Sequence, residues 1–401
     1  MKIFVLNAGS SSIKYKLFHM DQKVQVLASG EVEKIAEEES FISLNKIKKK
    51  VRCSNHREGL QLIIQQLNEA GILKDFSNLN AIAHRVVHGG SVFYEPTLID
   101  ETVTEQIRQM IPLAPLHNPA NLEGITAMQH LAPDVIQIAF FDTAFHQSMQ
   151  ASSFRYALPE SYYHEMQIRR YGFHGISHHY LAKESAQFMG KSLQNCNLIT
   201  LHLGNGASAT AIQNGKSIET SMGFTPLEGL VMGSRSGDLD PGILLYLLNE
   251  QHYDGEELDL LLNHQSGLKG LCGTNDMKII IQKIKQGEEN AKLAFDIFCQ
   301  KIKQYIGAYI ALLGNVDAIV FSGGIGANSP EVREAVCSNM ATLGIILDKE
   351  KNQEDLTLIG DKGHIQILKI ETDEEFEMAD QSLEIIKQTD GNTQKSELTK
   401  K

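Results

Sequence analysis

One pattern occurs twice in this chain and limits the folds that are open to it. The stretch VLNAGSSSIKYKLF (5–18) sets six consecutive small or polar residues between two strand-like segments. The stretch NLITLHLGNGASATAIQNGKSIE (197–219) repeats the order of strand, small-residue loop, strand, Asn-Gly turn and strand. Aligning Gly9 with Gly206 gives an offset of 197 residues. The pattern indicates an internal duplication, with two unrelated hairpins as the alternative.

The length and the remaining pattern predict two α/β domains. A chain of 401 residues exceeds what one hydrophobic core usually serves. Residues 2–32 have the alternation of three strands, and NHREGLQLIIQQLNEAG (55–71) has the spacing of an amphipathic helix that stops at a glycine. The apolar run VIQIAFFDTAF (135–145) predicts a buried strand that ends at Asp142.

The second half continues this alternation. EENAKLAFDIFCQKIKQYIGAYIALLG (288–314) has the longest helical pattern, and the strand VDAIVF after it runs into SGGIGANSPEVREAV. There Ser329 is expected as an N-cap and Pro330 as the first helical residue, so that a glycine-rich loop opens into a helix. The strand HIQILKI precedes TDEEFEMADQSLEII, where Thr372 and Glu375 have the spacing of a capping box.

Charge and cysteine content narrow the function classes. A formal net charge of -12 repels polyanions, which argues against nucleic acid as a partner. The five cysteines are scattered, with no CxxC pair, as in reduced cytoplasmic proteins. The sequence has no apolar run long enough to serve as a signal peptide or to cross a membrane. We therefore expect a cytoplasmic protein that acts on small molecules.

The first small-residue loop has the composition of a phosphate-binding turn. Backbone N–H groups around Gly9, the hydroxyls of Ser10, Ser11 and Ser12, and the Lys14 amine are donors that suit phosphate oxygens. The alternative is a plain hairpin with a polar tip. The spacing matches neither GxxxxGK[ST] nor GxGxxG, and a strand follows, so a P-loop enzyme or a dinucleotide-binding dehydrogenase does not fit.

Two further glycine-rich loops follow apolar strands, HLGNGAS (202–208) and GGIGANS (323–329). The first could supply more phosphate donors, and the second could let a nucleotide approach the backbone beside a helix N-terminus. Together the three loops resemble the phosphate-1, phosphate-2 and adenosine elements of the sugar kinase, Hsp70 and actin superfold.

Nine segments, spread over nearly the whole chain, resemble the acetate kinase family in order and spacing. They are NAGSSSIKYKL, AHRVVHGG, PLAPLHNPANLEGI, FFDTAFH, YGFHGISH, HLGNGAS, TPLEGLVMGSRSGDLDP, SGGIGANSPEVR and TDEE. The resemblance implies reversible transfer of the ATP γ-phosphoryl group to acetate, giving acetyl phosphate and ADP. Propionate and butyrate kinases share many of these segments and remain alternatives, as does a non-catalytic nucleotide-binding protein of the superfold.

The resemblance also implies an architecture. Two duplicated ribonuclease H-like domains would enclose an interdomain cleft, and the second domain would form a homodimer. The expected N-terminal domain is 1–147 with 371–387, and the C-terminal domain is 148–370. The polar tail 388–401 has no apolar face and is expected to be disordered.

The family pattern assigns four catalytic residues. Arg85 and Arg235 match the family's two arginines, whose planar forks suit a carboxylate and a transferring phosphoryl group. The alternative for each arginine is a structural ion pair. His174 matches the histidine that donates a hydrogen bond in the transition state. Its alternative is metal binding with His164, His178 and His179, but Gly175 and an expected cap at Ser177 place His174 before the helix and not one turn from His178. Asp142 matches the active-site aspartate, or else caps the next segment.

The remaining family positions concern metal, acyl group and nucleotide. Asn7 and Glu374 match positions around Mg²⁺ (or Mn²⁺), whereas Glu375 is explained by the capping box. The acyl methyl pocket is matched by Val87, Leu116, Phe173 and Pro226. ATP positions are matched by Ser10, Ser12, Lys14, His202, Leu203, Gly204, Asn205, Gly206, Asp276, Met277, Lys278, Gly324, Ile325, Gly326, Ala327 and Asn328.

Two departures from the family pattern fall on the expected adenosine site. Lys278 stands where the family usually has arginine, and Ala327 stands where a glutamate is common. A lysine neither stacks nor forks as arginine does, so the preferred nucleotide base is open. Neither change falls on a residue that is expected to act in phosphoryl transfer.

Overall fold

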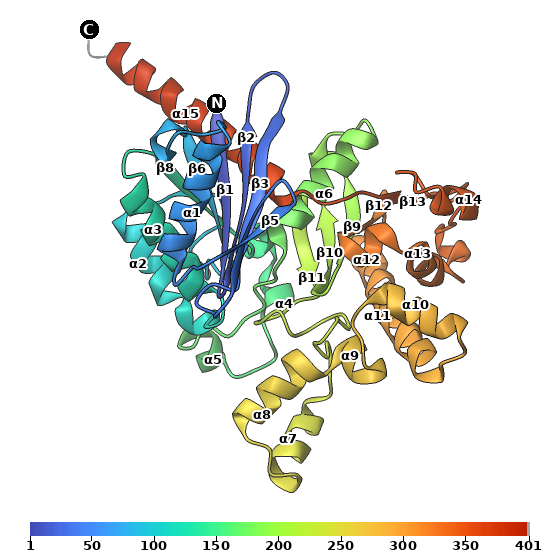
Figure 1. Ribbon diagram of the computed structural model, residues 1–401. Helices are drawn as coiled ribbons and strands as arrows, with labels where there is room; N and C mark the ends of the chain where they lie inside the picture. Colours follow the sequence, from blue (N-terminus) through green and yellow to red (C-terminus); the bar gives the residue numbers. More distant parts are fainter. Residues whose placement is uncertain (399–401) are drawn as a thin grey trace. The chain divides into compact units, whose positions relative to one another are not determined.

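The computed structural model describes residues 1–398, which divide into two compact units (Figure 1). Unit 1 comprises Met1–Ala144 and the segment from Asp373 onward, and unit 2 comprises Phe145–Thr372. These boundaries lie close to the predicted ones at 147 and 371. Each unit has its own mixed β-sheet, as an α/β chain of this length requires.

Unit 1 is built on an eight-stranded sheet in the order β5-β4-β3-β2-β1-β6-β8-β7. β1, β2 and β3 form an antiparallel meander, and β6 and β8 continue the sheet in parallel with β1. The strands are β1 (Lys2–Gly9), β2 (Ser12–His19), β3 (Gln25–Glu33), β4 (Ser40–Leu44), β5 (Ile47–Val51), β6 (Ala81–Val86), β7 (Thr97–Leu98) and β8 (Ile136–Phe141).

The helices of unit 1 cover this sheet because alternate strand residues are apolar. Leu6, Ile13, Tyr15 and Ile82 point to one face and share a core with Leu60 of the first helix. On that face α3 contacts β1 and β6, and α1 contacts α3 and β2. The helices are α1 (His56–Glu69), α2 (Glu101–Gln109), α3 (Asn118–Leu131) and α15 (Glu374–Leu398).

Unit 2 repeats the core topology of unit 1. Its sheet has the order β11-β10-β9-β12-β13, with β9, β10 and β11 antiparallel and β12 and β13 parallel to β9. This is the order β3-β2-β1-β6-β8 of unit 1, so the duplication predicted from the two loops is confirmed. The strands are β9 (Asn197–Leu203), β10 (Ala207–Gln213), β11 (Lys216–Thr220), β12 (Ala318–Ser322) and β13 (Gln366–Lys369).

Most helices of the molecule belong to unit 2, where α6 and α11 pack on the sheet. Two short helices, α4 and α5, precede α6 in the chain, α7 to α10 lie between β11 and α11, and α12 to α14 lie between β12 and β13 (Figure 1). The helices of unit 2 are α4 (Ala151–Phe154), α5 (Glu160–His164), α6 (Gly175–Phe188), α7 (Pro241–Glu250), α8 (Gly255–Leu260), α9 (Gly267–Cys272), α10 (Met277–Lys285), α11 (Glu289–Leu313), α12 (Gly323–Asn328), α13 (Pro330–Cys337) and α14 (Lys349–Gln353).

The glycine-rich stretch after β12 differs from the prediction. Gly323–Asn328 forms the short helix α12 and not a loop, although Ser329 and Pro330 stand at the predicted N-cap and first helical position of α13. Gly323 has a φ of +75°, and a Cβ there would lie 2.6 Å from the Leu203 carbonyl oxygen. This close approach lets α12 begin directly at the strand end.

The start and end of α15 also differ from the prediction. The Asp373 carboxylate, and not the Thr372 hydroxyl, accepts a bond from the Phe376 N–H at 3.0 Å and caps the helix. Glu375 is therefore not half of a capping box, and it pairs with Lys16 at 3.6 Å. The helix continues to Leu398, where a disordered tail was expected, because extending a helix without proline costs less than starting one. Residues 399–401 lie outside the described part.

No helix among the described residues has the length and apolar character needed to cross a membrane. All five cysteines are free thiols, and Cys272 is the least buried of them.

Candidate active-site residues in two units

Unit 1 brings Arg85, Asp142 and Glu374 together, and we call these three residues the carboxylate cluster. Arg85 lies in β6 and Asp142 follows β8, so parallel pairing places them at neighbouring strand ends. Nε and Nη2 of Arg85 donate to the two carboxylate oxygens of Asp142 at 3.0 and 2.8 Å. Nη1 lies 3.3 Å from Oε2 of Glu374. One guanidinium thus serves two carboxylates through separate nitrogens.

Burial opposes every charge in the carboxylate cluster. The side chain of Asp142 is only 4% exposed, and that of Arg85 is 20% exposed. Burial by itself lowers the pKa of Arg85, but the neighbouring Asp142 and Glu374 outweigh it and raise that pKa. Burial raises the pKa of Glu374, and Arg85 offsets part of this rise. Two acids share one cation, so a further cation would be stabilised beside them.

The face of the unit 1 sheet that carries Arg85 also carries the predicted donors of the first loop. Asn7 pairs with Lys14, and Gly9 with Ser12, and partners in an antiparallel register share a face. Arg85 is on this face too, since β6 runs in parallel register with β1. The N-terminal end of α15 lies here as well, because Lys16 on the same face donates to Asp373 at 2.9 Å.

Two residues that sequence reasoning missed hold the first loop in place. Nε2 of the buried His56 lies 2.7 Å from the Gly9 carbonyl oxygen, and Nδ1 lies 3.0 Å from Glu123. The Asn121 amide donates to the Ala8 carbonyl and accepts from the Val87 N–H. The signal for Asn121 was present, since polar residues on the buried face of a helix need partners.

In unit 2, His174 occupies the position just before α6. Its backbone is left-handed, with a φ of 57° and a ψ of 24°, which is uncommon for a residue other than glycine. The sequence predicted this position ahead of the helix. Ser177, which was expected to cap α6, lies inside the helix, and its hydroxyl contacts His202 and Thr372 at 2.8 Å.

The ring of His174 is part of a hydrogen-bonded cluster. Its Nδ1 lies 2.9 Å from the Ser208 hydroxyl, which also contacts Nε2 of His178 at 2.7 Å. The His202 ring stacks on His174 with centroids 4.3 Å apart. Of this group, only His174 and His202 were singled out from the sequence as site residues.

Arg235 lies close to this cluster and has neutral neighbours. Its Nη1 donates to the Pro226 carbonyl at 3.2 Å and approaches the Met232 sulfur at 3.7 Å. Among the described residues it has no carboxylate partner, and burial lowers its pKa. A Cβ placed on Gly206 would lie 3.5 Å from Nε2 of His174 and 3.6 Å from Nη1 of Arg235. Both side chains therefore border the second small-residue loop.

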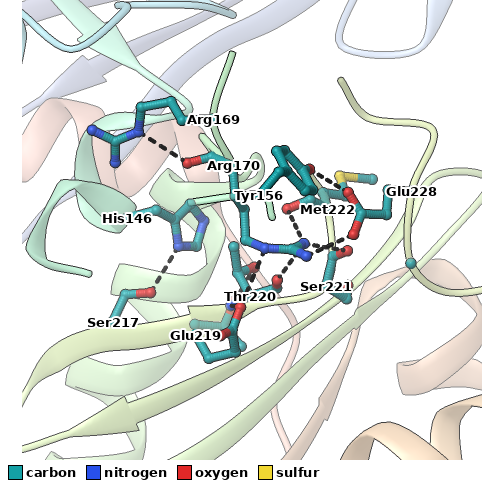
Figure 2. Close-up of polar contacts among 12 residues, drawn as sticks. His146, Tyr156, Arg169, Arg170, Ser217, Glu219, Thr220, Ser221, Met222 and Glu228 are labelled. Carbon is teal, nitrogen blue, oxygen red and sulfur yellow. Dashed lines mark hydrogen bonds and ion pairs between the residues drawn. The ribbon is translucent and has the colours of Figure 1, made fainter. Parts of the chain in front are cut away.

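A half-buried ion-pair network supports the segment that carries Pro226 (Figure 2). Nη1 of Arg170 donates to the carbonyls of Thr220, Ser221 and Met222, at 3.1 to 3.2 Å. Nη2 donates to Glu228 at 2.6 Å, and the Tyr156 hydroxyl donates to the same carboxylate. The network therefore holds residues 220–222 and Glu228, which lie at the two ends of the stretch that contains Pro226. Nothing in the sequence pattern pairs these distant residues.

Next to the second loop lies a pocket of about 640 Å³. It is the right size for a small ligand. Many of the predicted ATP residues line it, from the loop after β9, the start of α10 and α12. They are Gly204, Asn205, Asp276, Met277, Lys278, Gly324, Ile325 and Asn328, joined by the unpredicted Asn275, Ile281, Gln282, Lys285, Ser329, Pro330 and Glu331.

The other predicted ATP residues do not line this pocket. Leu203 and Ala327 are buried, and Ser10, Ser12 and Lys14 belong to unit 1. Arg333, which was not predicted from the sequence, supports the α12 side of the pocket. It is buried and donates to the carbonyls of Gly326 and Ala327. Asp276 accepts from the Lys278 N–H at 2.8 Å and so caps α10.

The four predicted acyl-pocket residues are divided between the units. Val87 and Leu116 belong to unit 1, where the Leu116 side chain is 61% exposed. Phe173 and Pro226 belong to unit 2, where His146 contacts the Phe173 carbonyl at 3.0 Å.

The residues predicted to hold Mg²⁺ fit that ion. Asn7 and Glu374 offer oxygen atoms, which Mg²⁺ prefers, and both are in unit 1, where Glu374 is one of the two acids that share Arg85. Within residues 1–398 no three His, Cys, Asp or Glu side chains are grouped as a metal cage. Mg²⁺ suits such a place because it keeps several waters and is usually shared with phosphate.

Comparisons with known proteins agree with the fold. The acetokinase family model matches residues 2–380. The acetate kinase of Sulfurovum sp. (strain NBC37-1) is 51% identical over 395 residues, which covers 96% of this chain and 99% of that protein. Two crystal structures are each 40% identical: Porphyromonas gingivalis acetate kinase (TM-score 0.92, 96% and 99% covered) and a Francisella tularensis propionate kinase (TM-score 0.89, 94% and 98% covered).

Proposed function

The chain belongs to the acetokinase family, and we propose that it transfers the ATP γ-phosphoryl group reversibly to acetate, giving acetyl phosphate and ADP. One observation carries the proposal beyond family membership. The imidazole of His174 and the guanidinium of Arg235, which has no carboxylate partner in residues 1–398, border the same glycine of a small-residue loop. Donors gathered in this way suit the charge that develops on a transferring phosphoryl group.

The reaction needs positioning and charge neutralisation more than proton transfer. Acetate is ionised at neutral pH, so its oxygen can attack phosphorus without a general base. The proposed transfer is direct and in line, with negative charge spread over the equatorial oxygens. In this proposal Arg235 and His174 donate hydrogen bonds to those oxygens, and Arg85, aligned by Asp142, binds the carboxylate or phosphoryl group.

Asn7 and Glu374 are the proposed holders of Mg²⁺. When bound, the ion would neutralise phosphate charge. Glu374 contacts Arg85 through Oε2, so the cluster orients this carboxylate. Mn²⁺ would satisfy the same oxygen atoms.

The pocket beside the second loop is the proposed site for the adenosine part of ATP. Gly204 and Gly324 would let the nucleotide approach the backbone, and Lys278 and Lys285 would add positive charge at its rim. Ser10, Ser12 and Lys14 of unit 1 are assigned to the phosphates.

Propionate is the second candidate substrate. One observation favours it: a propionate kinase structure is as similar in sequence to this chain as an acetate kinase structure is. A single methylene in an apolar pocket changes preference by only about 1 to 3 kcal/mol. The acyl-pocket residues therefore encode the preference weakly.

Trapping of acyl phosphate with hydroxylamine tests the activity. Mg-ATP and acetate should give acetohydroxamate, and kcat/KM measured for acetate, propionate and butyrate ranks the three acids. The absence of hydroxamate from all three would favour a nucleotide-binding protein without catalysis. A parallel series with GTP would show which base the pocket prefers.

A homodimer and a cytoplasmic location complete the proposal. Helix α7 is apolar and has no buried residue, with Ile243, Leu245, Tyr246 and Leu248 between 39% and 59% exposed. Such a surface is typical of an interface. Sedimentation equilibrium should give a dimer, and Leu245→Glu should shift it toward monomer. The free cysteines agree with a reducing compartment.

A further inference from the structure

A buried chain of hydrogen bonds leads from the sheet of unit 2 to the ring of His174. The Thr200 hydroxyl lies 2.7 Å from Nδ1 of His178, and Nε2 of His178 lies 2.7 Å from the Ser208 hydroxyl. That hydroxyl lies 2.9 Å from Nδ1 of His174. Thr200, His178 and Ser208 have no exposed surface. Each proton in the chain must therefore find its acceptor inside the protein.

The hydroxyl of Ser208 limits how the protons are arranged. It has one proton but contacts nitrogens of two imidazole rings, so at least one ring must donate to it. Burial, together with the nearby His146 and His202, lowers the pKa of His178 well below the ordinary value. His178 is therefore neutral and carries a single N–H.

Three arrangements satisfy these limits. In one of them both rings donate to Ser208, and the Ser208 proton then has no acceptor, since within residues 1–398 its oxygen contacts only these two rings. The other two arrangements are a chain of bonds in one direction and its reverse. In the first direction, Thr200 donates to Nδ1 of His178, Nε2 of His178 donates to Ser208, and Ser208 donates to Nδ1 of His174. In the second direction all three bonds are reversed. The Thr200 hydroxyl proton then has no acceptor, since among the described residues its oxygen contacts only His178. A buried hydroxyl proton without an acceptor is costly, so the first direction is favoured.

The favoured direction determines which nitrogen of His174 carries the proton. Nδ1 accepts from Ser208, so the proton of the neutral ring is on Nε2. That nitrogen is the one near Gly206, where Arg235 also lies. The ring therefore presents an N–H donor to the small-residue loop without needing a positive charge.

We infer that Thr200, His178 and Ser208 are positioning residues that hold His174 as the neutral tautomer with its proton on Nε2. This inference rests on the proposed role of His174 as a hydrogen-bond donor to the transferring phosphoryl group. In a serine protease triad a buried carboxylate holds a histidine in the required tautomer. Here a neutral chain of two hydroxyls and one imidazole would do so.

Nitrogen-15 NMR of the full chain labelled at histidine tests the inference directly. The His174 signals, identified by their loss in His174→Ala, should show a protonated Nε2 and an unprotonated Nδ1 at neutral pH. In Thr200→Val, which keeps the side-chain shape but removes the first donor, the signals should shift toward a mixture of tautomers. A proton on Nδ1 of His174 in the unchanged protein would overturn the inference.

Kinetics give a second readout and a matched control. Ser208→Ala should lower kcat by about tenfold, toward the 10²–10³ lost when one transition-state donor is removed, with little change in KM for ATP or acetate. Ser185→Ala should leave kcat unchanged, because that buried hydroxyl donates only to Leu181 of its own helix. In a His174→Ala background, Ser208→Ala should cause no further loss. A further loss there would show a merely structural role and overturn the inference.

The two proposals fail in different ways. Suppose that His174→Ala left kcat unchanged and that NMR of the unchanged protein showed the His174 proton on Nε2. The assigned catalytic role would then fail, and the tautomer assignment would stand. If His174→Ala lowered kcat but the proton lay on Nδ1, the catalytic role would stand and the positioning chain would fail.

Discussion

Arg85 and Arg235 were predicted to do similar work, yet the structure gives them opposite surroundings. Arg85 contacts two carboxylates, which raise its pKa against the effect of burial. Arg235 contacts a carbonyl and a thioether, and burial lowers its pKa. The two arginines come from different units with related sheets. Fold duplication has therefore not produced duplicate sites.

The different surroundings of the two arginines predict different consequences for stability and for catalysis when each is removed. A buried charge without a counter-ion is costly, and a protein usually keeps such a charge where function needs it. The half-buried Arg235 comes close to this description, and an anionic ligand would supply the carboxylate-like partner that it lacks among the described residues. Arg85 already has its counter-ions, so its removal would leave Asp142 buried and unpaired.

The largest effect is expected from Arg235→Ala. Turnover should fall by about 10³ or more, as when a single arginine is removed from a phosphoryl-transfer site. The dissociation constant for ATP, measured by calorimetry, should change only a few-fold, because the pocket for adenosine is intact. Equal losses in turnover and nucleotide binding would contradict the role assigned to Arg235.

Arg85→Ala should have the larger effect on stability. The free energy of unfolding, measured by urea denaturation, should fall by about 3 to 5 kcal/mol because a buried pair loses one partner. The double variant with Asp142→Asn should recover part of that loss. Arg235→Ala, which strands no carboxylate, serves as the matched control and should be about as stable as the parent. Similar stabilities for the two single variants would remove the contrast between the arginines.

Glu374→Gln should change the metal requirement while Glu375→Gln should not. The Mg²⁺ concentration for half-maximal activity should rise about tenfold in Glu374→Gln, a loss typical of altered metal surroundings. Glu375 pairs with Lys16 and serves as the neighbouring control. If both variants responded alike, a general electrostatic effect would explain the result. Titrations with Mn²⁺ would extend the test to the second metal.

Lys278→Arg should have the smallest effect and should change only the binding of ATP. Lys278 lines the pocket at the start of α10, where an arginine could stack on a base. A gain of about 0.5 to 1 kcal/mol in such contacts corresponds to a two- to fivefold lower KM for ATP. An unchanged kcat would show that the pocket affects nucleotide binding alone. A changed kcat would show that it also affects the chemical step assigned to the two arginines.

Local signals in the sequence were read successfully where they act over a few residues. The helix predicted from 55 begins with the Asn55 cap, and the Asn-Gly turn at 214 and 215 has positive φ at both positions. The position of Asp142 after a buried strand was also predicted. Alternation and turn chemistry act over short distances, so they can be judged without tertiary contacts.

Prediction failed where a neighbour distant in sequence decided the outcome. Thr372 looked like a cap, but its hydroxyl contacts Ser177, and Asp373 took its place. GGIGAN looked like a loop, but it forms a short helix that begins where Gly323 lies close to the Leu203 backbone. The partners of Arg170 lie at the end of β11 and after it, and those of His178 lie on β9 and β10, and no spacing along the chain indicates them.

The sequence by itself determined the duplicated α/β units, the loops at their strand ends and the identities of the candidate catalytic side chains. Only the tertiary structure decided which arginine is neutralised, which groups hold His174, and which residues support the pocket. The physical reason is that strand and turn preferences are local, whereas charge pairing and proton placement depend on the buried groups that folding brings together.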